Sequence, residues 1–335
     1  MKRSLCIFAI AMIAAFTASL SIARTWYVKA DGTGDAPTIQ AGIDSAATGD
    51  TVLVASGTYT SSVDVSIEGV PRKVNVYLNK NILLTAEEPF HKAVLDLTGI
   101  DGAVYIDETY AAVLRGFKIQ GQPRWPDWSG SGPSVYCGSG CTIELNRIEN
   151  NWYGTGIYIQ DDSLDPKYLR HNLLLHNYAG VHVCGAKVTV ENNTIFSDTA
   201  TEFGVSVFFS PECAADLLIE NNILVWGDRA VDCYPSCDPS AYSIRCNAIY
   251  ETILDTKQTT SIAALDASNF ELGAYGDPQF CGAAANNFYL QSDSPCAPGN
   301  HPRGYDCGYI GAYPVNCGTT ATKMKTLGNI KDLYR

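Results

Sequence analysis

Charged residues are scarce in this sequence. They make up 17% of its 335 residues, whereas apolar residues make up 46%. Disordered chains combine low hydrophobicity with high charge, so this composition excludes a largely disordered protein. Lys and Arg total 23 against 35 Asp and Glu, a formal net charge of −12. Nucleic-acid binding depends on clustered Lys and Arg, so a nucleic-acid partner is excluded as well.

Long apolar runs and long helical patterns are also missing. After position 23 the sequence has no apolar run of about 18 residues, so we expect no transmembrane segment in the mature chain. The 29 Gly and 19 Tyr, together with many Asn, indicate short strands and turns. The length allows a large core.

The N-terminus has the three parts of a signal peptide. A basic start, Met1–Arg3, precedes an apolar stretch from Leu5 to Phe16 and a small-x-small motif that ends at Ala23. We therefore predict that residues 1–23 are cleaved and that the protein is secreted or lies on the cell surface. A membrane anchor is disfavoured because the stretch is short. Loss of two positive charges takes the formal net charge from −12 to −14.

Cysteine usage fits an oxidising compartment. Twelve Cys become eleven after cleavage, and most of these should form disulfides. Cys137 with Cys141, and Cys233 with Cys237, are close enough to close small loops. The competing interpretation is a CxxxC metal site, which lacks a His at ligand spacing. Because eleven is odd, one thiol is free or pairs between chains, and the connectivity cannot be derived.

A repeat dominates the middle of the chain. Five segments place an Asn at the same phase between aliphatic residues, with spacings of 26, 21, 29 and 25 residues. They are Ile143–Ile148, Leu169–Leu174, Val190–Ile195, Ile219–Leu224 and Ile244–Ile249. A second strand with period-2 alternation follows each of the first four. These strands are Gly156–Ile159, Gly180–Val183, Gly204–Val207 and Ala230–Cys233.

Stacked coils explain this repeat best. Strands this short need a neighbour to bury their apolar face, and stacking forms parallel sheets around one interior. An antiparallel sandwich would not require the same Asn in five successive units. We expect a buried ladder in which each Asn bonds to the next coil. Its members are Asn146, Asn172, Asn193, Asn222 and Asn247. A column of mixed charge should point outward beside it, at Glu144, Arg170, Glu191, Glu220 and Arg245.

The two ends carry a family resemblance. Trp26–Asp35, Thr38–Ala41 and Gly49–Tyr59 resemble the N-terminal cap of right-handed parallel β-helix proteins, the pectin-lyase-like group that includes pectin methylesterases. A short helix near Pro37 would cover the first coil. Asp277–Phe280 and Asn287–Cys296 look like the closing segment of surface-sorted bacterial β-helix proteins, and Gly308–Tyr313 looks like its last strand. The resemblance implies an all-β, right-handed parallel β-helix over residues 24–317, and the repeat and strand-like runs predict about nine or ten coils.

Residues 318–335 form a separate basic tail. Lys323, Lys325, Lys331 and Arg335 stand against one Asp332, and apolar residues recur at helical spacing. We expect either a docking or sorting segment or a frayed terminus.

Known catalytic sets of the resembled family are incomplete here. Lyases of that family use a Lys or Arg base, often with calcium, and the methylesterases use paired Asp with an Arg beside Gln. Gln160–Asp161 is a lone match to the second set. Asp161, Asp162 and Asp165 are candidate calcium ligands, although a solvated acidic turn is the simpler interpretation. No cofactor is required by the sequence.

Two groups of residues are candidates for a functional site. The second strands align Tyr158, His182, Ser206 and Asp232 on one outward face, and of these Tyr158, His182 and Asp232 are candidate acid–base groups. The alternative is an ordinary exposed strand face. Trp125, Trp128, Trp152 and Tyr153 are candidate sugar-binding rings, or else pack against the coil beneath them. His171 and His176 read as turn or surface residues.

The preferred functional interpretation is a non-catalytic, monomeric surface protein that binds polysaccharide or cell-surface glycan. The alternative is a polysaccharide lyase or glycoside hydrolase that acts in a groove on the β-helix. The negative body disfavours uronate polymers unless cations screen them.

Overall fold

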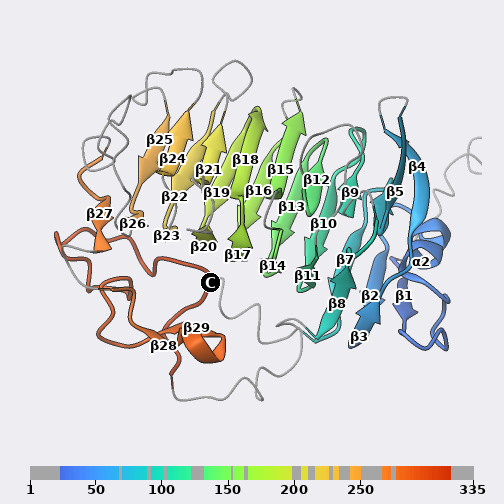
Figure 1. Ribbon diagram of the computed structural model, residues 1–335, viewed down its shortest axis with the longest axis horizontal. Helices are drawn as coiled ribbons and strands as arrows, with labels where there is room; N and C mark the ends of the chain where they lie inside the picture. Colours follow the sequence, from blue (N-terminus) through green and yellow to red (C-terminus); the bar gives the residue numbers. More distant parts are fainter. Residues whose placement is uncertain are drawn as a thin grey trace, which may run out of the picture.

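The computed structural model describes residues 23–67, 70–88, 92–100, 104–121, 132–151, 154–161, 165–197, 205–209, 216–225, 229–233, 242–249, 266–272 and 277–317. Within these ranges the chain coils into a β-solenoid whose strands form three long parallel sheets (Figure 1). The predicted signal peptide, apart from Ala23, and the basic tail lie outside the described residues.

Two sheets contain nine strands each, and all their pairings are parallel. Sheet A consists of β1 (Thr25–Val28), β2 (Thr51–Val54), β7 (Leu83–Ala86), β10 (Ala112–Arg115), β13 (Cys141–Glu144), β16 (Lys167–Arg170), β19 (Val188–Glu191), β22 (Leu218–Glu220) and β25 (Ser243–Arg245). Sheet B consists of β3 (Gly57–Tyr59), β8 (Ala93–Asp96), β11 (Lys118–Gln120), β14 (Arg147–Glu149), β17 (Leu173–Asn177), β20 (Thr194–Ser197), β23 (Ile223–Val225), β26 (Ala248–Ile249) and β27 (Phe270–Glu271).

The third sheet contains seven strands. Sheet C consists of β6 (Val76–Leu78), β9 (Val104–Ile106), β12 (Val135–Cys137), β15 (Thr155–Asp161), β18 (Ala179–Gly185), β21 (Val205–Phe209) and β24 (Arg229–Cys233). Seven coils therefore have a strand in every sheet, and the described ends add incomplete coils. The prediction of nine or ten coils counted these ends as if they were complete.

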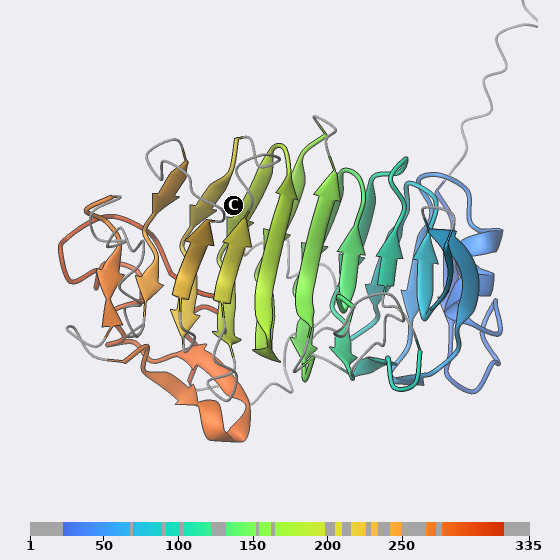
Figure 2. The ribbon, with the colours of Figure 1, turned by 45° about the horizontal axis from the view of Figure 1, so that its top comes forward.

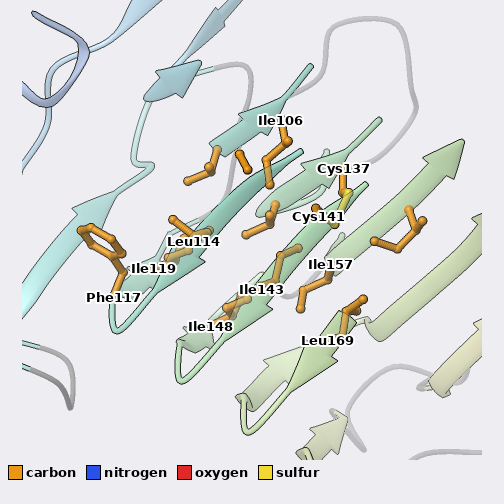
Figure 3. Packing of buried hydrophobic residues seen from close by; sticks show 14 of the residues in the cluster. Ile106, Leu114, Phe117, Ile119, Cys137, Cys141, Ile143, Ile148, Ile157 and Leu169 are labelled. Carbon is orange, nitrogen blue, oxygen red and sulfur yellow. A yellow bond between two sulfur atoms is a disulfide. The ribbon is translucent and has the colours of Figure 1, made fainter. Parts of the chain in front are cut away.

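One apolar column per sheet fills the interior. Strands of sheets A and C alternate between inward aliphatic and outward residues, as period-2 patterning requires. Figure 3 shows Leu114, Ile143 and Leu169 following one another from coil to coil in this core. The inward Cys137 and Cys141 form the predicted disulfide across the corner between β12 and β13.

The N-terminal end is closed by helix α2 (Ile39–Ser45), as the sequence predicts. Thr38 is its N-cap and accepts a hydrogen bond from the amide of Ala41. Ile39 and Ile43 are buried against the first coil. The hairpin of β4 (Val63–Ile67) and β5 (Val70–Val74) is antiparallel and lies outside the three long sheets.

The C-terminal segment, residues 277–317, folds back along sheet B (Figures 1 and 2). It contains β28 (Phe280–Gly282), the short 3-10 helix η2 (Ala283–Ala285) and β29 (Asn287–Leu290). Phe288 and Tyr313 pack over Leu173 and Leu175, and Ile310 packs with Ile223. The expectation of a last strand at Gly308–Tyr313 is wrong, because these residues bond instead to turns of the solenoid.

Two further disulfides fix this segment. Cys246 is joined to Cys307, and Cys281 to Cys317. Cys184 is also disulfide-bonded, whereas Cys296 is a buried free thiol. The predicted Cys233–Cys237 pair is not described, because Cys237 lies outside the described residues.

Candidate functional site

The predicted asparagines form a continuous buried ladder at the corner between sheets A and B. We call this ladder the asparagine file. From Asn172 onward, the Oδ1 atom of each Asn accepts from the main-chain N and the Nδ2 of the Asn one coil before it. For Asn193 these donors are the N and Nδ2 of Asn172, at 2.9 and 3.1 Å. Its own Nδ2 donates to Leu169 O at 2.8 Å. Each amide therefore satisfies its polar atoms without water, and this file stacks the coils.

The file has a sixth member that the repeat pattern missed. Asn269 Oδ1 accepts from the N and Nδ2 of Asn247 at 2.9 and 3.0 Å. Asn269 is not preceded by the aliphatic–Glu or aliphatic–Arg pair of the other copies, which is why it escaped notice. At the other end, Phe117 occupies the Asn position and donates its amide to Asn146 Oδ1.

The charge column beside the file forms ion pairs and is less exposed than expected. Arg115 and Arg170 both bond to Glu144, whose carboxylate is almost fully buried beneath them. Arg245 bonds to Glu220 at 2.8 Å. Burial is the main cause that raises the pKa of Glu191, which stands 4.0 Å from Arg170.

Aromatic rings form a second column, on the outer face of sheet C. Strand register places one ring in each of six successive coils: Tyr77, Tyr105, Tyr136, Tyr158, His182 and Phe208. Neighbouring ring centroids are 5.8, 4.6, 5.6, 4.6 and 4.5 Å apart. The column is thus a continuous series of ring contacts along the solenoid axis.

Only part of this column is open. Val63 and Val65 of the β4–β5 hairpin pack over its first rings, and Tyr105 and Tyr136 are buried. Tyr158, His182 and Phe208 remain partly exposed further along the sheet. We call these three residues the open ring surface.

The register corrects one predicted member of this face. Phe208, not Ser206, stands opposite His182. The alignment of Gly204–Val207 with Gly180–Val183 was displaced by two residues, and period-2 alternation cannot detect such a shift because the face is unchanged. Asp232 follows Phe208 in the next coil, so a phenyl ring separates it from His182.

His182 is a neutral ring in this setting. Burial lowers the pKa of His182 to about 4. Its ring contacts Tyr158 and Phe208 edge-to-face. The structure brings Tyr158 and His182 together but does not bring Asp232 to either, so these three residues are not one acid–base constellation. A histidine with this pKa is deprotonated at neutral pH and is a weak base there.

The structure describes some of the other predicted site residues. Trp125, Trp128, Trp152 and Tyr153 lie outside the described residues. Of the candidate calcium ligands, Asp161 and Asp165 are described and Asp162 is not. In the described ranges no three His, Cys, Asp or Glu side chains are grouped as metal ligands. No described helix is long and apolar enough to cross a membrane.

Comparison with known proteins agrees with the fold. Residues 95–249, slightly less than half of the chain, match the family described as "Right handed beta helix region". The protein is therefore a right-handed parallel β-helix. The crystal structure of pectate lyase Pel9A is similar over 90% of this chain and 98% of that chain, at 13% identity and a TM-score of 0.34. No curated protein matches the chain.

Proposed function

We propose that this protein is a non-catalytic extracellular module that binds neutral polysaccharide or cell-surface glycan on the outer face of sheet C. The observation that carries the proposal is the open ring surface, a run of aromatic side chains that continues a rigid column. Rings held by their neighbours lose little conformational freedom on binding, and their apolar faces suit sugar rings.

Disulfides and charge support the compartment and the ligand class. Three disulfides join described cysteines, which fits an oxidising environment outside the cytosol. The formal net charge of −12 repels polyuronates in the absence of screening cations. A neutral glycan meets no such repulsion.

Four aromatic residues precede β12 and β15 in the sequence. They are Trp125 and Trp128, before the strand that bears Tyr136, and Trp152 and Tyr153, before the strand that bears Tyr158. The proposal assigns these four side chains to the same glycan site.

Binding to a panel of neutral and acidic polysaccharides tests the proposal. We expect Tyr158→Ala, and the pair Trp125→Ala with Trp128→Ala, each to weaken binding at least about tenfold, the loss of roughly one stacked ring. Tyr168→Ala is the matched control, because Tyr168 is exposed in the same coil but on sheet A. Equal effects of Tyr158→Ala and Tyr168→Ala would reject the site.

The enzymatic alternative is tested in the same samples. Release of reducing ends, or absorbance from unsaturated products, would reveal hydrolase or lyase activity. Turnover that disappears in His182→Ala while glycan binding persists would replace the binding module by an enzyme.

A further inference from the structure

A column of residues with left-handed backbone, at the corner of sheets A and B, bonds to the C-terminal segment. The residue before Phe117, and the residue before each of the first five asparagines of the file, adopt a left-handed backbone, with φ between 50° and 83°. These residues are Gly116, Leu145, His171, Asn192, Asn221 and Cys246. We call them the corner column.

From His171 onward, each member of the corner column bonds to the C-terminal segment. His171 Nδ1 lies 3.1 Å from the Tyr309 hydroxyl, and Asn192 Nδ2 donates to Tyr309 O at 2.8 Å. Asn221 O accepts from the amide of Gly311 at 2.7 Å. Cys246 forms the disulfide to Cys307. In each of these four coils the corner column thus makes a bond to the segment, and the bond of Cys246 is covalent.

His171 is the titratable member of this column. Its side chain is 6% exposed, and its ring also hydrogen bonds to the main chain of Ala312. A neutral imidazole can accept from the Tyr309 hydroxyl and donate to Ala312, whereas an imidazolium donates from both nitrogens and carries its positive charge in a buried position. Glu144 of β13 and Arg170 of β16 are the charged groups that act on it, with opposite signs.

We infer that His171 is an acid-sensitive latch, and that its protonation releases residues 308–313 from sheet B while the Cys246–Cys307 disulfide keeps the segment tethered. Release uncovers apolar residues of sheet B, including Leu173 and Leu175, which the segment covers at neutral pH. The latch is thus a member of the corner column. When the segment is released, the part of sheet B that it covered becomes an accessible apolar surface.

The direction of the pH effect follows from the burial of the ring. Burial is the largest cause that lowers the pKa of docked His171 to about 4, and Arg170 lowers it further. A released His171 titrates near its ordinary value of 6.5. Docking is therefore fully favoured above pH 6.5, and the ratio of docked to released segment falls about a hundredfold as the pH drops towards 4.

Hydrogen exchange of the full-length oxidised protein tests the latch. After correction for intrinsic exchange rates, we expect the amides of Ile310, Gly311 and Ala312 to lose protection between pH 7 and pH 4 in the wild type. Amides of the asparagine file, such as Asn193, should stay protected over this range. Unchanged protection of residues 310–312 in the wild type would overturn the inference.

His171→Asn is the matched variant, because Asn occupies the corner column in the next two coils and tolerates the left-handed backbone. It keeps Glu144, Arg170 and the other carboxylates, so it separates their titration from that of His171. We expect this variant to lose the pH dependence. The same pH-dependent loss of protection in His171→Asn would refute the latch.

Tyr309→Phe provides a test that keeps the histidine. It removes the hydroxyl that bonds to the neutral ring, so we expect the release midpoint to move to higher pH. A midpoint equal to that of the wild type would contradict the role assigned to this contact.

Discussion

The asparagine file and the ring column both place one side chain in each coil, but they differ in burial and in the residue types that they contain. The file is buried at the corner of sheets A and B, and every amide there is identical and bonded to the next. The ring column lies on the outer face of sheet C and tolerates Tyr, His and Phe in turn. Repetition inside the fold is constrained by hydrogen-bond geometry, whereas repetition on a face is constrained only by size and shape.

The largest effect should come from breaking the file. Asn193→Ala removes the acceptor for two donors of Asn172 and leaves them buried, so we expect a loss of about 3–5 kcal/mol in the free energy of unfolding. Urea denaturation followed by far-ultraviolet circular dichroism measures it. Thr189→Ala, outward in the same coil, should change this value by less than about 0.5 kcal/mol. Similar losses in the two variants would show that the file is not what stacks the coils.

The covalent contact of the same corner should rank second. Replacing Cys246 and Cys307 by Ala opens a loop of 61 residues, and we expect a loss of about 3–4 kcal/mol in the free energy of unfolding. The Cys137 and Cys141 pair spans only 4 residues, so its double Ala variant should lose less. Thermal unfolding of both variants, each checked for the remaining disulfides, decides the order. The reverse order would contradict the loop-length argument.

A smaller effect should follow from the ion pairs next to the file. Glu144→Gln weakens the charged hydrogen bonds to Arg115 and Arg170, so we expect a loss of about 1–2 kcal/mol in the free energy of unfolding. Glu191 follows Arg170 in the charge column and lies 4.0 Å from it, so Glu191→Gln should lower the free energy of unfolding by less than about 0.5 kcal/mol. Denaturation midpoints at low and high salt would compare the two. A larger loss for Glu191→Gln would mean that burial does not set the strength of these pairs.

The smallest effect should be on the ring column. His182→Phe keeps an aromatic ring between Tyr158 and Phe208, so we expect stability within about 0.5 kcal/mol of the wild type and glycan affinity within about twofold. His182→Ala, which deletes the ring, should weaken both. Calorimetric binding and thermal unfolding provide the two measurements. A His182→Phe variant that binds no glycan would show that the imidazole nitrogens, not ring shape, are needed.

The sequence predicted the stacking because the same Asn recurs at one phase in five successive coils. Phase alone predicts five of the six amides in the file, and Pro37 with the apolar spacing of Ile39 and Ile43 predicts the N-terminal helix. The outward column was less secure. Ser206 was placed where Phe208 stands, because a surface position has no strict residue preference that would fix the register.

Contacts between distant parts of the chain were beyond sequence reasoning. His171 reads as a turn residue, and it is one, but its burial comes from Tyr309, which is 138 residues away. His301 is buried as well, and its Nε2 lies 2.7 Å from the main-chain O of Ser268, 33 residues away. Nothing in the local pattern of either histidine encodes the segment that covers it.

Local repetition alone determined that this chain forms a rod of parallel coils, because strands too short to bury themselves must lie against copies of themselves. The tertiary structure decided which faces of the rod stay open. The β4–β5 hairpin covers the first rings of sheet C, and the C-terminal segment covers sheet B. Those choices depend on long-range packing between dissimilar surfaces, which carries no period in the sequence.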